Sequence, residues 1–186
     1  MGTAAEAMRV LDIGRHRRAR VWMGGLPDAR YAHSGIVSAE SHVRVEGSSL
    51  WQAAAVEVFV PLGARYMYGL LGGEVEPTTA AASLAIDVKV SSAVERSFLG
   101  HLAPARANVR VGLPGEYAQA VVDGVLDASD WLFPGRLTIN CAAHDPVGSS
   151  RAVFRGLATV LVKVLKSAIP TATDEQLAVL FSEAFR

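Results

Sequence analysis

The feature that most constrains the fold is a regular alternation of large apolar side chains with small or polar ones at residues 84–90. Its apolar members are Leu84, Ile86, Val88 and Val90. A period of two residues is typical of a strand with one buried face. Shorter alternating segments predict further strands at 8–13, 18–23, 42–46, 108–113 and 137–141.

Helical periodicity marks three later segments. Apolar residues recur every three or four positions in 117–128 and in 153–168, which predicts two amphipathic helices. Pro170 is expected to end the second of them. Thr173 is then expected to cap a final helix whose apolar face includes Leu177 and Phe181. Helices that alternate with strands predict an α+β fold, arranged as a two-layer sandwich.

Residues 49–71 are predicted to be helical as well. Ser49 and Gln52 have the spacing of a capping box, so a helix is expected to begin there and to run through 53–59. Pro61 should kink or end it, because proline lacks the backbone donor. A second short helix is predicted at 64–71.

A boundary is predicted at residues 72–79, which are rich in Gly, Pro and polar side chains. It separates an N-terminal α+β half at 1–76 from a second half at 80–170, and a C-terminal helix at 171–186 is expected to pack on the body.

Two short motifs occur in both halves. Gly-Leu-Pro stands at 25–27 and 112–114, and Gly-Ser-Ser stands at 47–49 and 148–150. We interpret these repeats as a possible duplication of βαβ-type halves. Such a duplication would give either two sheets or one continuous sheet.

The composition of the chain limits the classes of protein to which it can belong. The chain is 51% hydrophobic and 19% charged, which supplies a core and argues against disorder. No apolar run reaches the roughly 18 residues that span a bilayer, and residues 1–12 lack the pattern of a secretion signal. We therefore expect a cytoplasmic protein without membrane contact. Cys141 is the only cysteine, and the histidines lack ligand spacing, so neither a metal nor a cofactor is expected.

One segment of the second half resembles a known family. Residues 112–117 are Gly-Leu-Pro-Gly-Glu-Tyr, and an Ala-Val and a Gly-Val pair follow within 120–125. This resembles the motif that opens a helix in domain IV of bacterial elongation factor G. Residues 144–150, His-Asp-Pro-Val-Gly-Ser-Ser, look like the segment that starts the last long helix of that domain.

The resemblance covers less than half of the chain and implies the two-layer fold also seen in the second domain of ribosomal protein S5. It further implies binding at the ribosome, because loops of the factor's domain IV enter the decoding site.

Three departures from the family's pattern concern the function. No Gly-x-x-x-x-Gly-Lys-Ser/Thr motif occurs, which excludes the GTPase activity. Residues 74–82 are acidic and Ala/Thr-rich where a Gly- and Lys-rich tip loop is expected, and Gly148 replaces an Asp.

Candidate contacts for RNA or another anion fall in two places. One is a basic cluster formed by Arg15, Arg17, Arg18 and Arg20, with Trp22 and Trp51 available for stacking. The alternative is a solvated hairpin without a ligand. A formal net charge of zero does not favour a dedicated nucleic-acid binder, although it leaves room for a local basic patch.

The second place is the helix start near His144, Ser149 and Ser150, where free amides could attract an anion. Asp145 and the two serines could instead simply cap that helix. A base-plus-nucleophile site is the third alternative, but it requires these neighbours to reach hydrogen-bond geometry. We therefore assign no catalytic residue.

These observations favour a non-enzymatic binding protein, associated with the ribosome or with RNA. The alternative is a small-molecule-binding or enzymatic domain that uses a cleft between the two halves. The first predicts a basic or apolar patch around residues 15–20, whereas the second predicts a pocket in which a histidine meets a carboxylate or hydroxyl. A homo-oligomer with an apolar subunit interface is a third interpretation.

Overall fold

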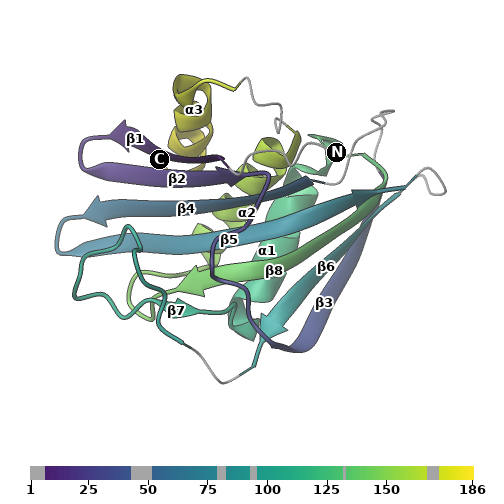
Figure 1. Ribbon diagram of the computed structural model, residues 1–186, viewed down its shortest axis with the longest axis horizontal. Coiled ribbons are helices and arrows are strands. Elements are labelled where there is room, and N and C mark those ends of the chain that lie inside the picture. Colours follow the sequence, from purple (N-terminus) through teal and green to yellow (C-terminus); the bar gives the residue numbers. More distant parts are fainter. Residues whose placement is uncertain (1–6, 43–51, 79–82, 93–95, 132, 167–171) are drawn as a thin grey trace.

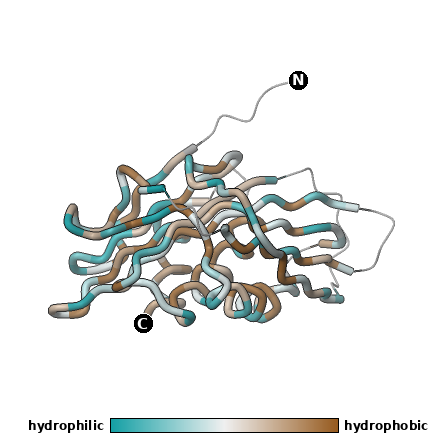
Figure 2. Tube along the Cα trace, turned by 90° about the horizontal axis from the view of Figure 1, so that it is seen from below, coloured by the Kyte–Doolittle hydropathy of each residue, from teal (hydrophilic) through white to brown (hydrophobic). Residues whose placement is uncertain are grey.

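The protein has an α+β fold, and its described residues form three α helices that pack on an open, mixed sheet of eight strands (Figure 1). The computed structural model describes residues 7–42, 52–78, 83–92, 96–131, 133–166 and 172–186. Figure 2 shows the helices on one side of the sheet. We call the opposite side of the sheet its outer face.

The strands follow one another in the sheet in an order that differs from their order in the chain. They are β1 (Ala7–Gly14), β2 (Arg17–Met23), β3 (His33–His42), β4 (Gln52–Leu62), β5 (Arg65–Pro77), β6 (Ser83–Ser91), β7 (Arg110–Val111) and β8 (Gly135–His144). The spatial order is β1-β2-β4-β5-β8-β6-β3, and the short β7 pairs with β8. Neighbours are antiparallel except for β6 and β8, which are parallel.

The helices build the main core against the inner face of the sheet. They are α1 (Gly115–Asp127), α2 (Arg151–Lys166) and α3 (Asp174–Ala184). Buried side chains of α2, among them Leu157, meet those of β4 and β5, while α3 packs against β1. A Cβ on Gly69 of β5 would lie 2.7 Å from the Leu157 side chain, so this glycine lets α2 approach the sheet closely.

The predicted helices at 53–59 and 64–71 are wrong, because these residues form β4 and β5. Residues 53–58 of β4 are buried on both sides of the sheet, so they show no alternation. Tertiary burial thus overrides the helical propensity of the three alanines at 53–55. Pro61 is tolerated because the pairing of β2 with β4 ends at Phe59, so its missing N–H breaks no bond on that side. Ser49 lies outside the described residues.

The predicted boundary at 72–79 does not interrupt the sheet. Gly72 and Gly73 lie inside β5, at an irregularity of its pairing with β8. A Cβ on Gly73 would lie 2.6 Å from the Thr138 carbonyl oxygen, so close strand packing explains this glycine. Strands from both predicted halves mix in one continuous sheet, in which β8 lies between β5 and β6 and β3 lies beyond β6.

The expected correspondence between the two halves is wrong at the Gly-Ser-Ser motifs. The described residues that follow the first motif form the strand β4, whereas Gly148-Ser149-Ser150 is followed directly by α2. The described residues of 7–78 contain strands and turns but no helix. The two halves therefore differ in their elements.

Most other elements agree with their predictions. The hairpin of β1 and β2, the strands β6 and β8 and the three helices are confirmed. The strand predicted at 108–113 is reduced to Arg110–Val111, and β3 was missed except for His42. Residues 43–46 and Pro170 lie outside the described residues.

Within the described parts of the chain, none of the helices has the length and apolarity needed to cross a membrane.

The capping box of α3 gives a first testable prediction. Thr173 Oγ1 accepts a hydrogen bond from the Gln176 backbone N–H at 3.2 Å, and Gln176 Oε1 accepts one from the Thr173 N–H at 3.0 Å. Thr173→Ala should lower the free energy of unfolding by about 1 kcal/mol, measured by urea denaturation. Ser182→Ala inside the same helix is the control and should leave stability equal or slightly higher. Equal losses in both variants would contradict the role of the cap.

Candidate nucleic-acid interface

Two hairpin turns that carry arginines lie next to each other at one end of the sheet (Figure 1). The β1–β2 turn at 14–17 carries Arg15 and Arg17, and the β4–β5 turn at 62–66 carries Arg65. The strand register places Arg18 opposite Phe59, so both turns are at the same end. A third turn at 104–107, closed by a 2.8 Å hydrogen bond from the Ala107 N–H to the Pro104 carbonyl, carries Arg106. We call Arg15, Arg17, Arg18, Arg65 and Arg106 the arginine end.

Two aromatic rings connect these arginines on the outer face. The Arg18 guanidinium lies over the Phe59 ring, 5.8 Å from its centroid. The Phe59 and Tyr66 rings are 5.8 Å apart between centroids and are both partly buried. Arg106 is near enough to Tyr66 for its charge to lower the pKa of the phenol. The two neighbouring aromatic rings thus lie between the positive charges of Arg18 and Arg106.

Tyr66 is held neutral and fixed in place. Burial raises the pKa of Tyr66 to about 12, and a hydrogen bond to the Asp145 carboxylate and its negative charge contribute to the rise. The phenol donates that bond to Asp145 Oδ2. Asp145 is buried, and its contacts lie inside the protein. The Gly148 N–H donates to the same carboxylate oxygen as the Tyr66 hydroxyl, at 3.1 Å.

The local charge at this end is positive although the chain as a whole is neutral. The turns 14–17, 62–66 and 104–107 hold four arginines and no carboxylate. Arg15, Arg18, Arg65 and Arg106 are exposed, whereas Arg17 is half-buried and donates to the Phe185 carbonyl at 3.5 Å. The exposed Asp12 lies on β1 nearby, and its Oδ1 accepts from the Gly14 N–H. Proteins bind the phosphates of nucleic acids through surfaces with a dense local group of positive charges.

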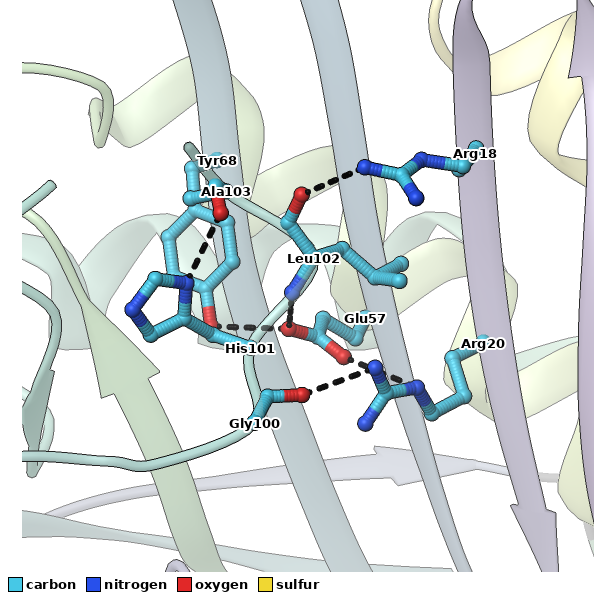
Figure 3. Close-up of polar contacts among 8 residues, drawn as sticks. All are labelled: Arg18, Arg20, Glu57, Tyr68, Gly100, His101, Leu102 and Ala103. Carbon is cyan, nitrogen blue, oxygen red and sulfur yellow. Dashed lines mark hydrogen bonds and ion pairs between the residues drawn. The ribbon is translucent and has the colours of Figure 1, made fainter. Parts of the chain in front are cut away.

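One long segment crosses the outer face beside the arginine end. We call residues 97–107 the strap. Phe98 and Ala103 of the strap pack in a second hydrophobic cluster with Trp22 and Tyr68. Two arginines also hold the strap in place. Arg18 donates to the Leu102 carbonyl at 3.1 Å, and Arg20 donates to the Gly100 carbonyl at 2.9 Å (Figure 3). The strap is therefore held by both apolar and polar contacts.

A fully buried carboxylate lies beneath the strap. Glu57 Oε1 accepts hydrogen bonds from the Tyr68 hydroxyl at 3.0 Å and from the Leu102 N–H at 2.9 Å. Its Oε2 is 3.4 Å from Arg20 Nε, an ion pair without hydrogen-bond geometry (Figure 3). Burial raises the pKa of Glu57, and the charge of Arg20, the two hydrogen bonds and His101 oppose that rise. The cluster ties β2, β4 and β5 to the strap.

The arginines of the predicted basic cluster do not act as one group. Strand alternation places Arg18 and Arg20 on the outer face, while Arg17 points toward the end of α3. Arg20 is held internally, beside Glu57 and with its guanidinium 5.2 Å from the Trp22 ring centroid. Trp22 is buried, and Trp51 lies outside the described residues.

Two members of the arginine end were missed from the sequence. Arg65 follows Gly63, whose positive φ of 65° marks the β4–β5 turn. Leu-Gly-Ala-Arg between two apolar runs could have been recognised as a hairpin loop, had 49–71 not been assigned to helices. Arg106 had no local signal, because only the strap brings it near Tyr66.

The second predicted site joins β8 to α2. His144 is buried, with Nδ1 3.1 Å from the Gly112 carbonyl and its ring edge-on to Tyr117. Ser149 Oγ donates to the Tyr68 carbonyl at 2.8 Å and accepts from the Asp145 N–H. Ser150 Oγ accepts from the Val153 N–H at 3.3 Å, as a helix cap does. These contacts anchor the start of α2 to β5.

Two further features are candidates for a site, namely Cys141 and a groove between α1 and α2. Cys141 is fully buried, and burial raises the pKa of its thiol to about 12, so the thiol stays protonated. A groove of about 480 Å³ opens between α1 and α2, lined in part by Glu116, Asp123, Arg151 and Arg155. Arg155 pairs there with Asp127, its Nη2 2.8 Å from the carboxylate. Among the described residues, no group of three or more His, Cys, Asp or Glu is placed to hold a metal ion.

Comparisons with known proteins supply no relative from which a function could be transferred. No protein-family model, curated protein or solved structure matches the chain. The function is therefore inferred from the residues themselves.

Proposed function

We propose that this chain is a non-enzymatic binding protein whose arginine end contacts the phosphates of RNA, with the ribosome as the expected setting. The observation that carries the proposal is the exposure of Arg15, Arg18, Arg65 and Arg106 at one end of the sheet, with the Phe59–Tyr66 pair between Arg18 and Arg106. Guanidinium groups bind phosphate with two parallel hydrogen bonds, and the release of counterions supplies the affinity.

The aromatic pair favours single strands or loops over a regular duplex. Unpaired bases can stack on aromatic rings and on the planes of guanidinium groups, whereas bases in a helix are not accessible for stacking. Phe59 and Tyr66 lie between arginines, the arrangement that a flexible strand can follow with alternating phosphate and base contacts. Because the net charge is zero, binding should be modest and strongly dependent on salt.

We also propose that the fold is of the ribosomal protein S5 domain 2-like type, as the resemblance to elongation factor G domain IV implies. Three features support it. Pro114 directly precedes α1, Ser150 caps the start of α2, and β6, β7 and β8 belong to one sheet. That resemblance is the reason for naming the ribosome as the expected setting.

The decisive test removes three exposed arginines that make no contact with the strap's carbonyls. The triple variant Arg15→Gln, Arg65→Gln, Arg106→Gln should bind a fluorescein-labelled oligo(U) 12-mer at least tenfold more weakly at 50 mM salt. Its slope of log affinity against log salt should fall by about 2, because each lost phosphate contact contributes about 0.7 for single strands. Fluorescence anisotropy measures both quantities.

The matched control removes the same charge from ion pairs elsewhere. Arg30→Gln, Arg136→Gln, Arg155→Gln breaks pairs with Glu74, Asp87 and Asp127. It should retain wild-type affinity within twofold. Equal losses in both triples would mean that only overall charge matters. If the wild type neither binds the oligonucleotide nor sediments with purified bacterial ribosomes at low salt, the proposal is wrong.

A further inference from the structure

The backbone of Leu102 connects the buried carboxylate to the proposed binding surface. Its N–H donates to Glu57 Oε1 at 2.9 Å, and its carbonyl oxygen accepts from Arg18 Nη2 at 3.1 Å (Figure 3). One residue of the strap therefore has Glu57 on one side and an arginine of the binding surface on the other.

Arg18 is placed by these contacts and is still able to bind a ligand. The Leu102 carbonyl holds its guanidinium over Phe59, while the residue remains exposed. A guanidinium has five N–H donors, and Leu102 accepts from one of them. The other donors can reach a phosphate without breaking the contact to the strap.

We propose that Glu57 is a positioning residue of the RNA-binding surface, which fixes Arg18 through the backbone of Leu102 and touches no ligand itself. This inference rests on the proposed function. Long side chains lose conformational freedom when they bind, so an arginine held in place beforehand binds phosphate more tightly than a mobile one. Loosening the strap should therefore weaken binding even though Glu57 is fully buried.

The surroundings of Glu57 fit this role. Arg20 of β2, Tyr68 of β5, and Leu102 and His101 of the strap all face the carboxylate. Burying a carboxylate costs free energy unless its oxygens accept hydrogen bonds or pair with a cation. An apolar residue at this position would avoid that cost. What the carboxylate supplies in return is a charged acceptor for the Leu102 N–H. An apolar side chain would offer no acceptor, and the neutral amide oxygen of a glutamine would offer a weaker one.

The test combines exchange and binding measurements on Glu57→Gln. Hydrogen exchange followed by mass spectrometry should show at least tenfold faster exchange of the Leu102 amide, and affinity for the oligo(U) 12-mer should fall about three- to tenfold. Glu74→Gln is the matched control, since Glu74 is a carboxylate on the outer face that pairs with Arg30. It should change neither measurement.

A double-mutant cycle separates positioning from a general loss of structure. In an Arg18→Met background, Glu57→Gln should change the affinity by less than twofold, because the arginine that Glu57 positions is absent. Equal losses in both backgrounds would overturn the inference but leave RNA binding standing. A wild type that binds no RNA overturns both.

If Glu57→Gln does not fold, Tyr68→Phe provides a milder version of the same cycle. It removes the hydroxyl that donates to Glu57 Oε1 at 3.0 Å and keeps the ring. The expected loss of affinity is about twofold in the Arg18 protein and none in the Arg18→Met background. An effect of the same size in both backgrounds contradicts the inference.

Discussion

Arg20→Met should lower the free energy of unfolding by about 3–5 kcal/mol at pH 7.5, measured by urea denaturation. Glu57 has no exposed surface, and Arg20 is the largest charge that offsets its burial. Methionine fills the volume of the arginine stem but leaves the carboxylate without its counter-charge. The same change at Arg136, which pairs with Asp87 at the surface, is the control and should cost less than about 1 kcal/mol.

The loss in Arg20→Met should depend on pH in a defined direction. The pKa of Glu57 is already above its ordinary value of 4.5, and removal of the Arg20 charge raises it further. A carboxyl group whose pKa is higher in the folded than in the unfolded state stabilises the fold most below the unfolded pKa. That contribution is lost as pH rises through the folded pKa. The deficit should therefore shrink at pH 4, and a deficit that is the same at both pH values would contradict the assignment.

Gly124→Ala should lower the free energy of unfolding by about 3 kcal/mol, because a methyl group has no space between α1 and α2. Its Cβ would lie 2.3 Å from the Arg155 carbonyl oxygen and 2.9 Å from the Ala158 Cβ. Since the oxygen belongs to the backbone of α2, the two helices would have to separate. Thermal unfolding should show a midpoint about 6–12 °C lower.

Gly115 in the same helix is the matched control for this glycine. The nearest atom to a Cβ there is Val90 Cγ1 at 3.5 Å, an ordinary contact. Gly115→Ala should therefore leave stability equal or somewhat higher, because alanine favours the helix. Similar losses in the two variants would show that helix packing at Gly124 is not the cause.

Local patterns predict an element well where its one buried face carries large apolar side chains at regular spacing. β6 alternates cleanly because Ile86 and Val88 meet the helices while Asp87 and Lys89 lie on the outer face. Thr173 was expected to cap the last helix, and the structure shows a capping box contained within four consecutive residues, Thr173 to Gln176. Both signals lie in consecutive residues, so the sequence alone is sufficient to find them.

Prediction failed for β4 and β5 because their outer faces are covered by a distant segment. Leu102 of the strap is 45 residues from Glu57, and this separation is invisible to any window of local sequence. With both faces buried, Val56 and Val58 have inward-facing side chains while Ala55 and Glu57 are buried on the other side. The alternation that marks a strand therefore disappears.

The candidate interface was predicted in part. The density of arginines at 15–20 indicated a basic hairpin, and Arg15 and Arg18 are exposed there. Arg20 has the same residue type and spacing but is held under the strap, because Glu57 lies opposite it in the register of β2 and β4. Spacing alone cannot distinguish an arginine that binds a ligand from one that pairs with a buried acid.

The central position of β8 has a consequence for biosynthesis. This strand lies between β5 and β6, yet it is made after both of them. Until residue 144 has left the exit tunnel, the nascent chain has two open strand edges facing each other and no strand to join them. The sheet can therefore be completed only late in translation, and the emerging chain should need protection from aggregation until that point.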